Sequence, residues 1–138
     1  AQDVVIQAAA PADYRPTHPS DHKLKKSSDP LLTLELTENP DVAAAVAEHR
    51  QPNQVLIGFA AETRDTLANA REKRARKQLD MIVANDVTLP GAGFGTDTNI
   101  ATLVTAAGET SYPLMSKREL AERILDEALA IRERFQKG

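Results

Sequence analysis

The sequence predicts an α/β domain in which a mostly parallel sheet is flanked by helices and extended by antiparallel strands. Segments of strand character alternate with segments of helical character along most of the chain. Residues 54–61 and 80–84 are almost entirely apolar, which is typical of strands buried on both faces of a parallel sheet. From residue 116 onward, apolar residues recur at helical spacing, which predicts a long helix packed on that sheet.

The N-terminal third is expected to contain two strands joined by a long loop. Residues 3–10 have the pattern of a buried strand that runs into small residues. Residues 13–30 are polar, interrupted by prolines and basic at 23–26, which predicts a long mobile loop of the kind that often forms a lid. Residues 32–37 alternate apolar and polar side chains, which predicts a half-exposed strand, antiparallel or at an edge.

Three residues mark the expected start of the first helix. Asn39 can cap it, Pro40 suits the first helical position, and Asp41 complements the helix dipole. The Ala-rich run that follows predicts a helix to about Arg50, and the backbone N–H groups at its start could bind an anion or a base carbonyl.

The middle of the chain is expected to alternate helix and strand. Thr63 can cap a helix over roughly 64–78, and the buried strand at 80–84 follows it. A Gly-rich loop is expected at 89–99, with a further strand at 100–105.

The C-terminal end is expected to form a hairpin partner and the last helix. After a turn at Gly108, residues 110–114 can return beside the preceding strand. Ser116 and Glu119 form a capping box at the start of the helix. The apolar stripe of this helix consists of Leu120, Ile124, Ala128, Ile131 and Phe135.

Composition excludes several kinds of site and partner. The 138 residues suffice for one compact domain, and the lack of Cys excludes disulfides, Cys-ligated metals and a cysteine nucleophile. The net charge of -3 argues against a nucleic-acid binder, and no apolar run approaches the roughly 18 residues of a membrane span. A cytoplasmic location is expected. Because a strand begins almost at Ala1, the chain is expected to be the second half of a larger unit.

An anionic ligand is expected at the carboxyl ends of strands 54–61 and 80–84, because open α/β sheets bind ligands there. Lys73 and Lys77 lie four residues apart on the intervening helix and share one face, where two ammonium groups could hold a triphosphate. The alternative is a solvated basic face, since further arginines surround them. The basic cluster at 23–26 could likewise close over an anionic substrate or be a solvated loop.

Polar residues at the strand ends also allow two interpretations. Asp13 follows the first strand and could contact a ribose, a base or a metal ion, or have no role. The other polar residues of this kind, which could bind a ligand or only make turns, are Glu62, Asn85, Asp86 and Asn99. The glycines at 91–95 lack the spacing of a dinucleotide fingerprint, which disfavours an NAD-dependent oxidoreductase. The spacing of the three His residues does not indicate a metal site.

Several short motifs occur in order along nearly the whole chain. They are A-A-P-A-D-Y-R at 9–15, K-L-K-K at 23–26, N-P-D at 39–41, G-F-A-A-E-T at 58–63, Lys73 with Lys77, A-N-D at 84–86, F-G-T-D-T-N at 94–99 and S-K at 116–117. This set resembles the bacterial phosphopantothenoylcysteine synthetases, the ligase half of the bifunctional coenzyme A biosynthesis flavoproteins. The resemblance implies that residues 1–138 are the C-terminal part of a Rossmann-like synthetase domain.

The resemblance also implies an activity. Members of the family activate 4'-phosphopantothenate with CTP and Mg2+, which gives an acyl-cytidylate and pyrophosphate. Cysteine then attacks, giving 4'-phosphopantothenoylcysteine and CMP. FMN belongs to the decarboxylase half, which lies outside this chain. A homodimer through the synthetase domain is implied, with the strand at 32–37 and its flanking loop as the expected contact.

Transferred residue by residue, the resemblance places the catalytic groups at Lys23 and Asp13. The implied nucleotide site comprises Gln7, Ala8, Ala9, Asp13, Lys23, Pro40, Asp41, Val42, Ala43, Phe59, Lys73 and Lys77. The family's Gly/Ser-rich phosphate turn, and its Asn that handles the acyl intermediate, lie upstream of the matched part. Metal ligands and the choice between CTP and ATP stay open. The alternative is a non-catalytic Rossmann-like nucleotide-binding or dimerisation fragment.

Overall fold

The computed structural model describes residues 2–25, 33–62, 65–91 and 95–137. They divide into two compact units. The larger unit comprises the chain up to Ala8 together with the residues from Ala43 onward, and the smaller unit comprises Ala9–Val42. Each unit contains a sheet of its own.

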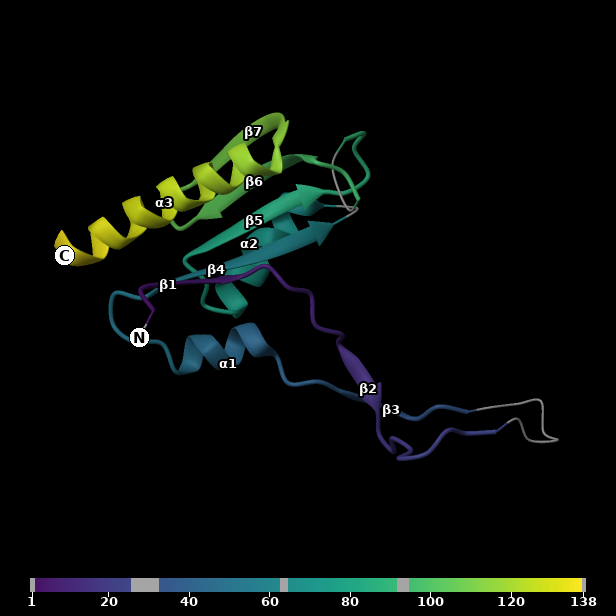
Figure 1. Ribbon diagram of the computed structural model, residues 1–138. Helices are drawn as coiled ribbons and strands as arrows, with labels where there is room; N and C mark the ends of the chain where they lie inside the picture. Colours follow the sequence, from purple (N-terminus) through teal and green to yellow (C-terminus); the bar gives the residue numbers. More distant parts are fainter. Residues whose placement is uncertain (1, 26–32, 63–64, 92–94, 138) are drawn as a thin grey trace. The chain divides into compact units, whose positions relative to one another are not determined.

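The larger unit is built on a five-stranded sheet with the order β1-β4-β5-β6-β7 (Figure 1). β1, β4 and β5 run parallel, whereas β6 and β7 are added antiparallel. The strands are β1 (Val4–Gln7), β4 (Val55–Glu62), β5 (Met81–Asp86), β6 (Thr98–Thr105) and β7 (Glu109–Ser116). The predicted α/β class, with a Rossmann-like parallel core and an antiparallel extension, is confirmed.

Helices cover both faces of this sheet (Figure 1). α3 (Lys117–Lys137) packs on one face with Ile57 and Met81. α1 (Val42–Glu48) and α2 (Thr66–Arg76) pack on the other face with Leu56 and Ile82. Successive side chains of a strand point to opposite faces, so neighbouring residues of β4 and β5 enter two separate cores. This two-sided burial explains why both strands lack polar alternation in the sequence.

The capping box at the start of α3 is confirmed. The Glu119 backbone N–H donates to Ser116 Oγ over 3.1 Å, and the Ser116 backbone N–H donates to Glu119 Oε2 over 2.9 Å. The predicted apolar stripe is buried at Leu120, Ile124, Ala128 and Ile131, whereas Phe135, in the last turn, stays 37% exposed.

The predicted helix over 40–50 is shorter in the structure. α1 spans Val42–Glu48, and the prediction that Asn39 caps this helix is wrong. The Asn39 side chain instead contacts Ala12 and Arg15, more than twenty residues earlier in the chain. Asn39 therefore forms hydrogen bonds with residues distant in the sequence and does not cap the helix. Short-range sequence patterns do not reveal such distant partners.

α2 also differs from its predicted range of 64–78, because it spans Thr66–Arg76. Asp65 occupies the N-cap position with φ 48° and ψ 37°, and its side chain makes no cap hydrogen bond. The predicted cap, Thr63, lies outside the described residues. At the other end, Lys77 is the C-cap residue, and its backbone N–H donates to the Lys73 carbonyl oxygen over 3.0 Å.

The smaller unit contains a short antiparallel pair where the sequence suggested a loop and a longer strand. β2 (Tyr14–Pro16) pairs with β3 (Leu36–Glu38), and Arg15 lies opposite Thr37. Residues 33–35 are not in a strand, so the prediction of a strand over 32–37 is wrong for them, and residue 32 lies outside the described residues.

Candidate functional site

The carboxyl ends of the parallel strands β1, β4 and β5 lie at one edge of the larger sheet, where α/β proteins bind their ligands. The parallel register brings the end of β1 beside β4, with Gln7 opposite Gly58. Further along β4, Ala61 lies opposite Asn85 of β5. Ala8 follows β1 directly and is exposed. The structure therefore places Gln7 and Ala8 next to the strand that carries Phe59.

Lys73 contacts β4 through its side chain, near the level at which β1 ends. Its ammonium group donates to the carbonyl oxygen of Phe59 over 3.1 Å, in a half-buried contact between α2 and β4. The Phe59 ring packs on the opposite core, with α3. Two predicted nucleotide residues from different elements are thus in direct contact, and a cationic group is held beside the middle of β4. Lys77 follows one turn later, at the C-cap.

Two of the arginines around these lysines, Arg71 and Arg74, have structural partners. Arg71 forms an ion pair with Glu109 of β7, and this hydrogen bond and charge raise the pKa of the Arg71 guanidinium. Arg74 donates to the Leu79 carbonyl oxygen over 3.2 Å. The basic face of α2 is therefore divided, because these two arginines bind Glu109 and the Leu79 carbonyl oxygen, whereas Lys73 binds β4.

In the smaller unit, Asp13 is joined to the chain that precedes Pro40 and Asp41. The Asn39 backbone N–H donates to the Asp13 carbonyl oxygen over 2.8 Å. Asp13 and Lys23 are both exposed. The structure thus brings Asp13 to the Asn39–Asp41 segment.

The remaining polar candidates divide into two groups. Asn99, expected in a loop, lies in β6 beside the register shift between Asn99 and Ala101, where its Oδ1 accepts a hydrogen bond from the Ile100 backbone N–H over 3.0 Å. Asn85 is half-buried at the strand end and fits either interpretation. The carbonyl oxygen of Gly91, a residue at φ 81°, accepts from Thr98 Oγ1 over 2.8 Å, so this glycine closes a loop. Residues 63 and 94, which belong to the family motifs, lie outside the described residues.

The three His residues form no metal site. His18 lies 3.8 Å from Glu35 at the surface, and His49 Nδ1 contacts the Ala45 carbonyl oxygen at 2.9 Å. In the described ranges, no group of three or more His, Cys, Asp or Glu side chains could hold a metal ion. In the same part of the chain, no helix is both long and apolar enough to cross a membrane.

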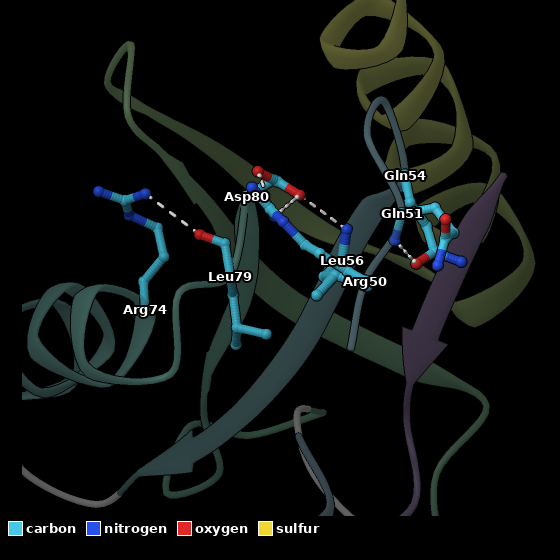
Figure 2. Close-up of polar contacts among 7 residues, drawn as sticks. All are labelled: Arg50, Gln51, Gln54, Leu56, Arg74, Leu79 and Asp80. Carbon is cyan, nitrogen blue, oxygen red and sulfur yellow. Dashed lines mark hydrogen bonds and ion pairs between the residues drawn. The ribbon is translucent and has the colours of Figure 1, made fainter. Parts of the chain in front are cut away.

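Sequence reasoning missed a polar network at the opposite edge, where β4 and β5 begin (Figure 2). Asp80 Oδ2 accepts from the backbone N–H of Leu56 over 2.8 Å and lies 3.1 Å from Arg50 Nη1. The Asp80 N–H in turn donates to the Leu56 carbonyl oxygen over 2.9 Å. Only the position of Asp80 before an apolar strand could have signalled this role, which is to align the two parallel strands.

The comparison with known families decides the assignment of the chain. Residues 1–131 match the model of the DNA/pantothenate metabolism flavoprotein C-terminal domain. The chain belongs to this family. The family resemblance inferred from the ordered motifs is therefore confirmed.

Two curated relatives of the flavoprotein C-terminal domain family are the coenzyme A biosynthesis bifunctional proteins CoaBC of Bacillus subtilis and Vibrio cholerae. The former is 47% identical over 132 residues, which is 95% of this chain and 32% of the relative. The latter is 46% identical over 123 residues, which is 88% of this chain and 31% of the relative. The chain thus spans about a third of these relatives.

A solved structure shows the same fold. The crystal structure of the C-terminal domain of a CoaBC protein is 39% identical, with a TM-score of 0.71. The match covers 95% of this chain and 57% of the solved chain. This flavoprotein C-terminal domain family member therefore shares the α/β fold of that domain.

Proposed function

We propose that this chain supplies the nucleotide-binding part of a CTP-dependent ligase that joins 4'-phosphopantothenate to cysteine in coenzyme A biosynthesis. The observation that carries the proposal is the contact of the Lys73 ammonium group with the Phe59 carbonyl oxygen in β4, one residue beyond the Gln7–Gly58 pair at which β1 ends. Both residues belong to the nucleotide set that the family resemblance implies. The names of the CoaBC relatives support the pathway.

The proposed reaction has two steps. The carboxylate of 4'-phosphopantothenate attacks the α-phosphorus of CTP, and the bond to the pyrophosphate breaks, which leaves an acyl-cytidylate. The amine of cysteine then attacks the acyl carbon, loses a proton and displaces CMP. Both reactants of the first step are anionic, so fixed cations lower their repulsion and stabilise the charge of the transition state.

In this proposal, Lys73 and Lys77 bind the phosphates, and Lys23 neutralises the reacting phosphate. Asp13 contacts the nucleotide. Ala8, Ala9 and Ala43 have small side chains, which permit a close approach of their backbone to the ligand. The other proposed nucleotide residues are Gln7, Pro40, Asp41, Val42 and Phe59.

We propose that Mg2+ binds as a complex with CTP. The described residues offer no cluster of three His, Cys, Asp or Glu side chains for a metal ion. Mg2+ commonly keeps several waters and binds through substrate phosphates with one or two carboxylates. In this proposal the ion arrives bound to the phosphates of CTP and would withdraw charge from them.

The second candidate is a nucleotide-binding or dimerisation fragment without catalysis of its own. It is supported by the coverage of only 57% of the solved C-terminal domain, which leaves part of that domain outside the match. Assembly as a homodimer and a cytoplasmic location remain predictions in both cases.

The proposal is tested by calorimetric titration of the chain with CTP, and then with ATP, in the presence of Mg2+. Saturable binding of CTP that is lost in Lys73→Ala is the expected result. A parallel titration uses a chimaera in which the chain follows the upstream residues of the Bacillus subtilis relative. Ligation of 4'-phosphopantothenate to cysteine by the chimaera, with the chain alone inactive, supports the fragment interpretation. Absence of nucleotide binding in both forms would overturn the proposed function.

A further inference from the structure

Asn39 binds the segment around Asp13 through its backbone and both ends of its side-chain amide. Its Nδ2 donates to the Ala12 carbonyl oxygen over 2.7 Å, and its backbone N–H donates to the Asp13 carbonyl oxygen over 2.8 Å. Its Oδ1 accepts from Arg15 Nη1 over 2.9 Å. Because one end of the amide meets a carbonyl and the other a guanidinium, a single orientation of this amide satisfies both partners.

Arg15 completes the connection from the other strand. The Nη1 atom that binds Asn39 also donates to the Glu38 carbonyl oxygen over 2.8 Å. Arg15 lies on β2 opposite Thr37 of β3, so its side chain reaches along the paired strand toward Asn39. These contacts join residues 12–15 to residues 38–39, and we call the pair Asn39 and Arg15 the clamp.

The clamp stabilises a very short two-stranded sheet, formed by β2 and β3. β2 and β3 have three residues each, and an isolated two-stranded pair is marginally stable in water. Hydrogen bonds to a charged guanidinium are stronger than those between neutral groups. The side chains of the clamp therefore determine how firmly the Ala12–Asp13 backbone is held.

We propose that Asn39 and Arg15 are positioning residues for Asp13 in nucleotide binding. Asn39 holds the carbonyl groups on both sides of the Asp13 Cα atom, so it fixes the backbone from which the carboxylate projects. Pro40 follows Asn39 directly, and its fixed φ restrains the entry to Asp41. This inference rests on the proposed function, because it requires that Asp13 contact the nucleotide.

If the clamp only stabilised the fold, its loss would lower the melting temperature and leave CTP affinity unchanged. The two apolar cores of the larger unit contain no residue of the segment 9–42 among those described. Loss of the clamp is therefore expected to shift the melting temperature by less than about 4 °C, the change that roughly 1 kcal/mol produces in a chain of this size. CTP affinity is the quantity that the clamp should change.

The test measures CTP affinity by calorimetry with Mg2+ in whichever form binds, the chain or the chimaera. Asn39→Ala is expected to weaken CTP binding about tenfold, the scale of one or two hydrogen bonds to charged or buried groups. Asp13→Asn should weaken it as well. The double variant should be no weaker than Asp13→Asn alone, because residues that act through one another are non-additive.

Conservative variants separate positioning from simple loss of packing. Arg15→Lys keeps a cationic donor for the Asn39 and Glu38 oxygens, so it should retain most of the CTP affinity that Arg15→Ala loses. Arg118→Ala is the matched control, because Arg118 is 91% exposed on α3 and pairs with Glu122 of the same helix. This control should bind CTP as the unmodified protein does.

The outcomes distinguish the two proposals. If neither unmodified form binds CTP, the proposed function fails, and this inference fails with it. If CTP binds normally and Asn39→Ala binds equally well, the positioning role is overturned while the proposed function stands. Additive losses in the double variant would also overturn it, because Asn39 would then act independently of Asp13.

Discussion

The ammonium group of Lys73 donates a hydrogen bond to the carbonyl oxygen of Phe59 across 3.1 Å. Lys73 lies in the last turn of α2, where a cation also interacts favourably with the negative end of the helix dipole. The contact orders a long side chain whose rotamers would otherwise be free to vary. A lysine held in this way can meet a phosphate at a lower cost in side-chain entropy.

Lys73→Met is therefore expected to weaken magnesium–CTP binding tenfold or more. The substitution keeps an unbranched stem and removes the charge, and a hydrogen bond to a charged group is worth about 1.5–3 kcal/mol. Calorimetric titration measures the change in affinity. Lys137→Met is the control, because Lys137 lies at the end of α3 with its side chain 78% exposed. Reduced stability with unchanged CTP affinity would assign Lys73 a purely structural role.

Gly58→Ala is expected to destabilise the larger unit by about 1–3 kcal/mol, the usual cost of overpacking a core. A Cβ atom at Gly58 would lie 2.6 Å from Leu79 Cδ1, and Leu79 is only 4% exposed. The Leu79 backbone is held on both sides by Arg74, so relief of the clash requires the buried Leu79 side chain to change its rotamer. Urea unfolding gives the free-energy change.

The mechanism behind this loss can be tested with a second variant. Leu79→Val removes the atom that meets the new Cβ, so Gly58→Ala should cost less in that background than in the unmodified protein. Equal costs in the two backgrounds would show that the contact with Leu79 is not the cause.

Asp80→Ala is expected to destabilise the protein by about 1–3 kcal/mol, because the backbone N–H of the buried Leu56 loses its acceptor. Asp80→Asn keeps an acceptor oxygen and should cost less, although it loses the charge beside Arg50 (Figure 2). Chemical denaturation compares the two. Asp126→Ala is the control, since Asp126 is 70% exposed and its pair with Arg123 should contribute less than about 1 kcal/mol. Equal stability of Asp80→Ala and Asp126→Ala would contradict this role.

The sequence predicts the elements of this fold where their determinants are local. Continuous apolar runs predict β4 and β5, since both faces of each strand are buried by helices. The box of Ser116 and Glu119 predicts the start of α3 within one turn. Asn39 shows the limit, because its local signal favours a cap while its actual partners are 24 and 27 residues away.

In the candidate site, too, the sequence predicts local features but not distant contacts. Lys73 and Phe59 could be named from motifs, but their contact depends on how α2 crosses back over β4. The sequence likewise does not predict the ion pair of Arg71 with Glu109, because these residues are 38 positions apart. Residue type and spacing therefore predicted which groups carry charge, whereas tertiary packing determines which of these charges already have a protein partner.

Ser116→Ala is expected to raise the pKa of Glu119 toward its ordinary range. In the folded protein, hydrogen bonds from the Ser116 side chain, and then from its backbone N–H, lower the pKa of this carboxyl. The variant removes the hydroxyl and keeps the backbone donor, so the rise should be partial. Titration followed by NMR measures it, and Ser111→Ala on β7 is the control that should leave Glu119 unchanged.

The sign of this shift also sets a pH dependence of stability. A carboxyl with a lower pKa in the folded than in the unfolded chain stabilises the fold above its unfolded pKa, about 4.3 for Glu. That contribution disappears as the pH falls through the lower, folded pKa of Glu119. The stability lost by Ser116→Ala should therefore be larger at neutral pH than below the folded pKa. An equal loss at both pH values in urea unfolding would show that the hydroxyl acts on α3 without involving the charge of Glu119.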